Sequence, residues 1–169
     1  KGANLRLFRH IRTKLDEANK QLGKDRGEAP DAKGRGIRFS HVMAVAPNAS
    51  SSIIMGNTSP SIEPWRANAY RQDTLSGAYL NKNKYLDAII KEYCEKHPRT
   101  NYDEVWSSII SNDGSVQHLT QLTDEQKKIF KTSMEIDQRW LIEHAADRQE
   151  FIDQAQSLNL FFRPDTNIA

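Results

Sequence analysis

The sequence HVMAVAP at residues 41–47 decides the fold class. It is a short, largely apolar run that ends at a proline. A run of this length and composition is typical of a strand buried on both faces, as in a parallel sheet or an α/β barrel. Pro47 has no amide hydrogen to give to a sheet ladder, so the strand is expected to end there. The sequence therefore predicts an α/β protein with a buried parallel strand at residues 41–46.

The segments around this strand are mostly helical. In the motif SLNLFF at residues 157–162, Leu158, Leu160 and Phe162 alternate with Asn159 and Phe161. The motif stops before Pro164, and this pattern predicts a second strand. Between the two strands, residues 60–80 predict irregular structure with a short hairpin. Apolar residues at helical spacing, together with cap residues, predict helices over 3–22, 82–96, 124–134 and 137–155, and one that starts at Asn101 and breaks at Asp113.

The small number of strands limits what the chain can form by itself. A parallel strand buried on both faces needs a neighbour on each side, and two strands do not make a stable parallel sheet. We therefore expect a mostly helical α/β segment with two or more strands that is not a complete fold alone. The chain also starts at Lys1 without an initiator methionine. From this we expect a processed or split product, or a piece of a longer protein.

Composition excludes several classes of protein. The 169 residues suffice for one ordinary domain. The 24 Lys and Arg nearly balance the 22 Asp and Glu, so composition gives no case for nucleic-acid binding. No apolar stretch approaches the roughly 18 residues of a membrane span, and we expect no signal peptide at this terminus. Cys94 is the single cysteine, which excludes an internal disulfide framework and a cysteine-based zinc site.

Charge divides the chain into two parts. Residues 1–40 carry 11 Lys and Arg against 5 Asp and Glu, a net +6, whereas the remainder has a net −4. We predict one part at 1–36, a helix and a basic flexible loop, and a second at 37–169 that contains the other elements. A basic leader could bind phosphate or an acidic partner. The alternative, which we favour because the basic residues are spread out, is a solvated helix face followed by a mobile loop.

The segment PNASSS at residues 47–52 is the best candidate site. It follows a buried strand at the carboxyl end, where α/β folds place their ligands. Small residues let backbone amides approach an anion closely, and serine hydroxyls add donors, so a phosphate would fit. The alternative is an ordinary serine-rich turn, which is the more common occurrence of such a sequence. Glu63 is a candidate acid, base or hydrogen-bonding group near this loop, although most such residues are structural.

No other motif carries a catalytic set. The five histidines show no metal-ligand spacing. His144 has Arg148 one helical turn away where a metal site would place a second histidine, so a packing role is favoured. Cys94 has no histidine partner nearby and is expected to be a structural thiol.

Five longer strings resemble one known family. They are GIRFS at 36–40, AVAPNASSS at 44–52, GNTSPSIEP at 56–64, DQRWLIEHAADRQ at 137–149 and FIDQAQSLNLFF at 151–162. In this order they resemble the late barrel segment of class I ribonucleotide reductase large subunits, over about residues 36–163. The resemblance implies that the chain is part of a ten-stranded α/β barrel.

The resemblance also implies a site. Its loop for the diphosphate of the nucleotide substrate matches Pro47, Asn48, Ala49, Ser50 and Ser51. This favours the phosphate interpretation of the loop over the ordinary turn. In many members of the family the loop also carries a carboxylate, which this chain lacks.

The resemblance further implies that the catalyst is incomplete in this chain. The cysteines that start and drive the radical reduction of the ribose lie upstream of the matched region in the family, and the radical-relay tyrosines and recharging cysteines lie downstream. We therefore expect no catalytic residue, metal or cofactor here. The partners implied are a large-subunit piece with the catalytic cysteines, a metal-containing small subunit that supplies the radical, and a nucleoside diphosphate. Nucleotide effectors would bind elsewhere, and we expect no nucleic acid or membrane partner and a cytoplasmic location.

Two other functions stay open. The chain could be a non-catalytic interaction module that docks a partner subunit through its C-terminal helices. A free-standing phosphate-binding α/β domain is the weaker alternative, because two strands are too few.

Overall fold

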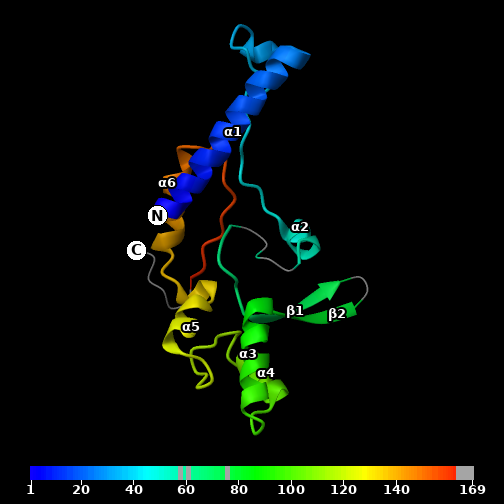
Figure 1. Cartoon of the computed structure of the whole chain (residues 1–169), viewed down its shortest axis with the longest axis vertical. Coiled ribbons are helices and arrows are strands. Elements are labelled where there is room, and N and C mark those ends of the chain that lie inside the picture. Colours follow the sequence, from blue (N-terminus) through cyan, green and yellow to red (C-terminus); the bar gives the residue numbers. More distant parts are fainter. Residues whose placement is uncertain (57–58, 60–61, 75–76, 163–169) are drawn as a thin grey trace. The chain divides into compact units, whose positions relative to one another are not determined.

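The computed structural model describes residues 1–56, 59, 62–74 and 77–162 (Figure 1). The chain forms two compact units. Unit 1 contains residues 1–48 and 138–159. Unit 2 contains residues 49–137 together with the end of the chain.

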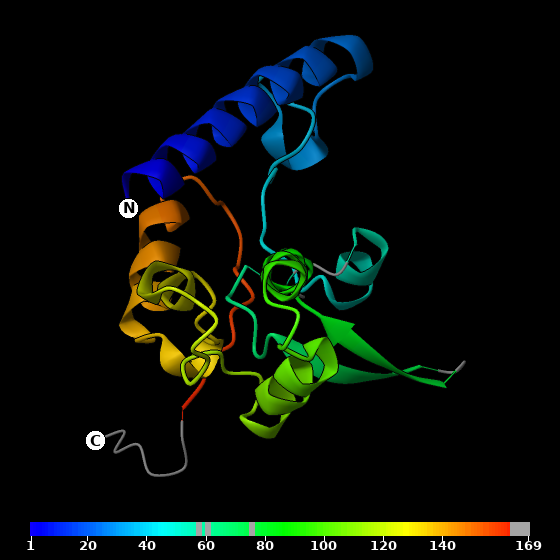
Figure 2. The same ribbon diagram turned by 60° about the horizontal axis from the view of Figure 1, so that its bottom comes forward.

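Unit 1 is built on two helices. Helix α1 (Gly2–Arg26) packs against α6 (Arg139–Gln149), as two views show (Figures 1 and 2). Phe8 of α1 packs with Phe151 and Ile152, which follow α6, and all three are buried. The apolar spacing that predicted helices in these regions thus supplies the core of the unit.

The chain after α1 folds back along the last turns of the helix. A short 3-10 helix, Pro30–Ala32, lies in this return segment. The buried side chain of Asn19 accepts hydrogen bonds from the amides of Arg38 at 3.0 Å and Phe39 at 2.7 Å. Helix α1 therefore extends four residues beyond the predicted end, because the returning chain covers its last turns. The predicted division at residue 36 stays a prediction.

The two predicted strands are not formed within the described part of the chain, and this expectation was wrong. Residues 41–46 are exposed or half-buried and make a single parallel bridge, between Val45 and Gln156. The amide of Val45 donates to the carbonyl of Ala155 at 3.1 Å, and the amide of Ser157 donates to the carbonyl of Val45 at 2.7 Å. The bridge joins the first predicted strand to the residue before the second. One bridge cannot extend into a ladder, because the described chain offers these residues no further strand to pair with.

Unit 2 contains the only sheet of the described residues. Strands β1 (Ala69–Thr74) and β2 (Gly77–Lys82) form an antiparallel hairpin with Ala69 opposite Lys82. This confirms the hairpin expected within residues 60–80. The helices of the unit are α2 (Ala49–Ile54), α3 (Lys84–Lys96), α4 (Tyr102–Ser111) and α5 (Asp124–Ile129), with a 3-10 helix at Ser133–Glu135.

The helix starts of unit 2 follow their cap residues. The Asn101 side chain accepts from the amide of Asp103 at 2.9 Å at the start of α4. Thr123 and Gln126 form a reciprocal capping box at the start of α5, where the sequence predicted the start of a helix. Helix α5 nevertheless ends at Ile129, five residues before the predicted end, because a second capping box turns the chain into the following 3-10 helix.

A buried asparagine ties these elements together. Asn68 is 2% exposed, and its Nδ2 donates to the carbonyls of Gly114 at 3.0 Å and Phe130 at 2.8 Å. Its Oδ1 accepts from Asn83, whose own side chain caps α3. The hairpin, α3 and the chain after α4 and α5 are thereby fixed around one polar residue. The apolar core beside it includes Leu86, Ile90, Val105, Trp106, Ile109 and Val116.

No described helix combines the length and the apolar character that crossing a bilayer requires.

Candidate functional site

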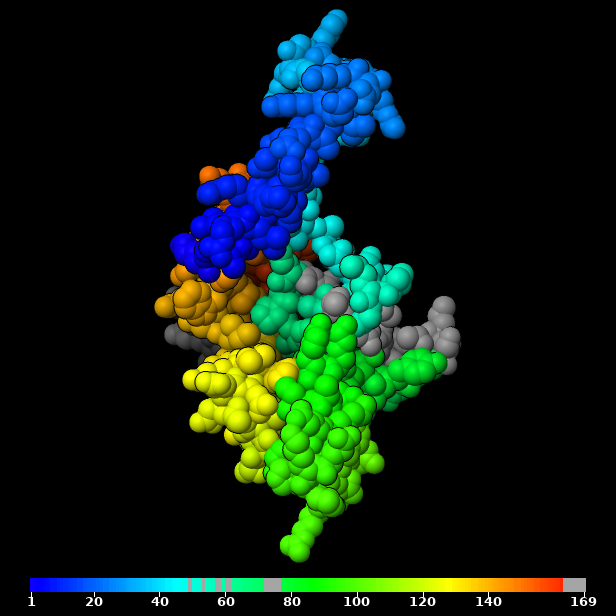
Figure 3. All heavy atoms as spheres, viewed as in Figure 1, coloured from blue at the N-terminus to red at the C-terminus, as the bar shows by residue number. Residues whose placement is uncertain are grey.

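The five predicted loop residues are consecutive and divide between the two units. Pro47 and Asn48 are exposed and end the first part of unit 1. Residues 49–51 form the first turn of α2 in unit 2. The side chains of Ser50 and Ser51 are exposed, whereas Ser52 is buried. The atoms of α2, coloured cyan, lie at the surface in Figure 3.

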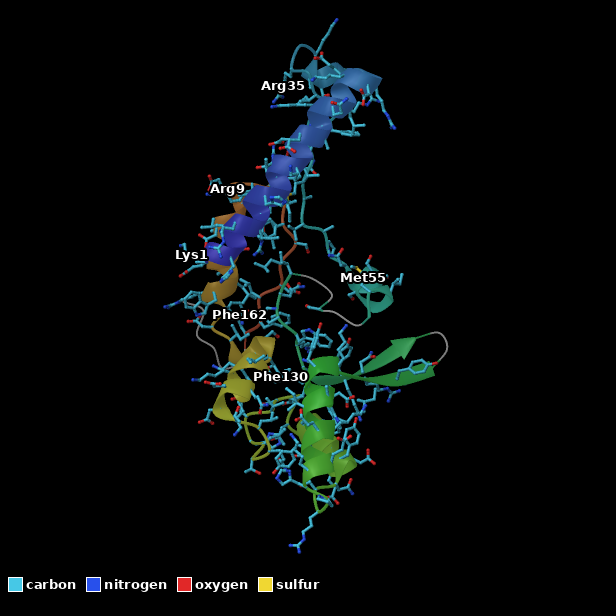
Figure 4. The ribbon with its side chains drawn as sticks, in the orientation of Figure 1. Lys1, Arg9, Arg35, Met55, Phe130 and Phe162 are labelled. Atoms are coloured by element: carbon cyan, nitrogen blue, oxygen red, sulfur yellow. The ribbon has the colours of Figure 1, made fainter. Side chains whose placement is uncertain are left out.

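The chemistry of this segment suits an anion. The first amides of a helix have no acceptor within the helix. Ser50 and Ser51 add two exposed hydroxyl donors, and Ala49 brings no bulk. The segment at 47–52 contains no lysine or arginine, so backbone amides and hydroxyls would supply the contacts. The far end of α2 is apolar and open, with Met55 73% exposed (Figure 4).

Residues 42–45, which lead into the loop, are held by the segment after α6. The Asp153 carboxylate accepts hydrogen bonds from the amides of Val42 at 3.1 Å and Met43 at 3.0 Å. It also forms an ion pair of 3.1 Å with Arg12 of α1. Burial acts to raise the pKa of Asp153, but the two amides and the Arg12 guanidinium outweigh it, so the pKa is lowered. Asp153 is therefore held as a carboxylate at neutral pH.

A glutamine holds the same segment two residues further on. Gln156, the bridge partner of Val45, accepts a hydrogen bond at its Oε1 from Arg148 Nε at 2.6 Å. Its Nε2 donates to the Gln149 side chain at 2.7 Å and to the Ala145 carbonyl at 2.9 Å. Both ends of the Gln156 amide are thus used within unit 1.

The sequence did not single out Asp153 or Gln156. The amide partners of Asp153 lie about 110 residues away in the chain. No local spacing indicates such a pairing, and the strings FIDQAQ and HVMAV are brought together by the parallel bridge and by the hydrogen bonds of Asp153.

The other singled-out residues have structural surroundings. Glu63 is 6% exposed, and its carbonyl accepts from the Ser59 hydroxyl at 2.6 Å. The ring of His144 lies edge-on to Trp140 in α6, as a packing histidine does. Cys94 is half-buried against the core of unit 2. Within the ranges that the structure describes, no three His, Cys, Asp or Glu side chains gather as a metal site would.

Comparison with protein families identifies the family to which the chain belongs. The family model described as the barrel domain of ribonucleotide reductase matches residues 12–169. The chain belongs to the ribonucleotide reductase barrel-domain family. The resemblance carried by the five sequence strings is thereby confirmed, and so is the assignment to part of an α/β barrel.

Individual reductases are similar to this protein in sequence along nearly its whole length. It is 56% identical over 164 residues to the ribonucleoside-diphosphate reductase large subunit of Invertebrate iridescent virus 6, covering 96% of this chain and 17% of that protein. It is 54% identical to the corresponding subunit of Invertebrate iridescent virus 3, covering 98% of this chain and 26% of that protein. A solved structure, the class Id ribonucleotide reductase alpha subunit of Actinobacillus ureae, is 42% identical with a TM-score of 0.84, covering 98% of this chain and 29% of that one.

The chain thus spans between about a sixth and a quarter of the length of these two curated reductases. The hairpin and the single parallel bridge are an incomplete barrel.

Proposed function

We propose that this chain is part of the large subunit of a ribonucleoside-diphosphate reductase and that it contributes the loop for the substrate diphosphate. The observation that carries the proposal is the match of residues 12–169 to the reductase barrel domain, together with reductase large subunits as relatives at more than 50% identity. In this proposal the reaction is the radical-based reduction of ribonucleotides to deoxyribonucleotides.

The proposed contacts come from five residues. Backbone amides around Ala49 bind the phosphate oxygens, and the hydroxyls of Ser50 and Ser51 donate further hydrogen bonds. Pro47 and Asn48 shape the approach to them. The exposed hydroxyls and the lack of bulky side chains in this segment support these roles.

The catalytic cysteines belong to another part of the large subunit in this proposal. Cys94 stands alone in the sequence and is half-buried against an apolar core, which suits a structural thiol. The radical would come from a metal-containing small subunit, and nucleotide effectors would bind elsewhere. We propose a cytoplasmic enzyme that assembles from these parts.

Two bulky substitutions test the proposed loop. Ser50→Trp and Ser51→Trp are introduced into the assembled reductase that contains this chain, and nucleoside diphosphate binding is measured. We expect the affinity to fall at least about tenfold, since the indole blocks the approach of the phosphate. Ser107→Trp, at an exposed serine of α4, is the matched control and is expected to have no effect. Unchanged affinity in the loop variants would show that the loop does not bind substrate.

A second candidate is an interaction module that docks a partner subunit through α6. The observation in its favour is the exposure of Trp140 at 56% and Ile142 at 51% on this helix. If this is the main role, Trp140→Ser weakens the association with the partner, and the loop variants leave nucleotide affinity unchanged.

A further inference from the structure

The segment before the loop is held by both apolar and polar contacts. Residues 41–46 contain no side chain that is fully buried, but Met43 and Val45 pack against the core formed by Phe8, Phe151 and Ile152. Val45 makes the single bridge of this segment. The direction of its backbone amides and carbonyls is set by the polar groups that contact them.

Asp153 provides the first of these contacts. Its two oxygens take the successive amides of Val42 and Met43, and the ion pair with Arg12 fixes the carboxylate itself. Hydrogen bonds from amides to a charged acceptor are stronger than neutral ones. The carboxylate thus joins α1 to residues 42 and 43.

Gln156 provides the second. The backbone on either side of it pairs with both polar groups of Val45. Arg148 and Gln149 of α6 hold its side-chain amide, so the bridge is fixed relative to α6. The loop begins at Pro47, two residues after Val45.

We infer that Asp153 and Gln156 are positioning residues for the start of the substrate loop, Pro47 and Asn48, acting through the backbone of residues 42–45. The inference rests on the proposed function of the loop. Phosphate recognition by backbone amides requires donors placed within about half an ångström, because the donors cannot adjust as long side chains do. The hydrogen bonds of Asp153 and the bridge at Gln156 hold the backbone that leads into Pro47 and Asn48, and they do so from α1 and α6 of the same unit.

The chain offers a matched control for Asp153. Asp16 of α1 binds the same guanidinium, with 2.9 Å between Arg12 Nε and Asp16 Oδ1, but contacts neither Val42 nor Met43 in any interaction that the described residues show. Asp16→Ala therefore removes a carboxylate partner of the same arginine and leaves the hydrogen bonds of Asp153 with Val42 and Met43 in place.

The experiment compares Asp153→Ala, Asp153→Asn and Asp16→Ala in the assembled reductase. KM and kcat for the nucleoside diphosphate are measured, and hydrogen exchange of the Val42 and Met43 amides is followed. We expect Asp153→Ala to raise KM about tenfold, to leave kcat within about twofold, and to accelerate exchange of both amides. Asp153→Asn, which keeps an acceptor oxygen, should restore most of the affinity, and Asp16→Ala should match the parent protein.

Gln156→Ala is a second, independent test. It leaves the backbone hydrogen bonds of the bridge in place but removes the side-chain hydrogen bonds that tie the bridge to α6. We expect faster hydrogen exchange at the amides of Val45 and Ser157, with a rise in KM. A variant of either residue that lowers kcat without changing KM would overturn the inference.

The outcomes separate the inference from the proposal beneath it. If Ser50→Trp raises KM but Asp153→Ala and Gln156→Ala behave like Asp16→Ala, the positioning role is wrong and the loop assignment stands. If none of these variants changes KM, the loop assignment itself fails, and the positioning role fails with it. Should Asp153→Ala not fold, Gln156→Ala decides: parent-like KM and parent-like exchange at Val45 and Ser157 in that variant would overturn the inference.

Discussion

Replacing Gly114 by alanine should strongly destabilise unit 2. Gly114 has a φ of +77°, and an added Cβ would lie 2.8 Å from Ala67 Cα and 2.9 Å from the amide nitrogen of Asn68. Both neighbours are backbone atoms and cannot rotate away. The carbonyl of Gly114 also accepts from the Asn68 side chain, so any shift disturbs the buried hydrogen bonds.

The magnitude follows from two costs and one gain. The left-handed conformation costs an alanine about 1–2 kcal/mol, and forcing the methyl group against packed backbone costs about 1–3 kcal/mol. Reduced freedom of the unfolded chain returns about 0.4–1 kcal/mol. We therefore expect a net loss of about 2–4 kcal/mol in the free energy of unfolding of unit 2, a large part of the stability of an ordinary domain.

Gly56→Ala is the matched control. Gly56 has a similar φ of +87° in the same unit, but the neighbouring atom is Lys84 Nζ at 3.5 Å, the end of a flexible side chain. It should show the conformational cost alone, about 1 kcal/mol. Native-state hydrogen exchange at the amides of α3 and α4 measures the stability of unit 2 directly. Equal losses in the two variants would refute the steric argument.

Three further changes have definite expectations. Burial, followed by the hydrogen bond to Asp87, raises the pKa of Tyr102 from 10 to about 12. The protonated hydroxyl therefore contributes its full stability below pH 10, and this contribution is lost as the pH rises through 12. Tyr102→Phe should remove this decrease of the unfolding free energy at alkaline pH. Thr123→Ala breaks the capping box with Gln126 and should cost about 1 kcal/mol, measured by urea unfolding, whereas a loss below a few tenths would show that the box contributes nothing. Asn68→Ala removes three buried hydrogen bonds, and we expect a loss of about 2–4 kcal/mol on the same assay; a loss no larger than that of Thr123→Ala would contradict its central place in unit 2.

The sequence predicted the features that depend on neighbouring residues. The helix starts after Asn101 and Thr123 and the hairpin within residues 60–80 all formed as expected. Each is decided by contacts within a few residues, which sequence patterns encode directly.

Features that depend on distant partners could not be predicted in the same way. The apolar run at 41–46 indicated a strand, but a strand requires a ladder partner, and the described chain supplies one bridge at Val45. Asp153 accepts hydrogen bonds from residues about 110 positions away, and no local sequence pattern indicates this contact. The assignment of the loop at 47–51 came from long matching strings, and family membership confirms the strings without testing what the loop binds.

The loop at residues 47–51 is proposed to recognise the diphosphate of the substrate. The most direct test is the binding of a nucleoside diphosphate and of the same nucleoside without phosphate to the assembled reductase, before and after Ser50→Ala and Ser51→Ala are combined. We expect the variant to bind the diphosphate about tenfold more weakly and the nucleoside unchanged, since only the phosphate contacts are lost. Equal effects on the two ligands, or no effect on either, would contradict the proposed role of the loop.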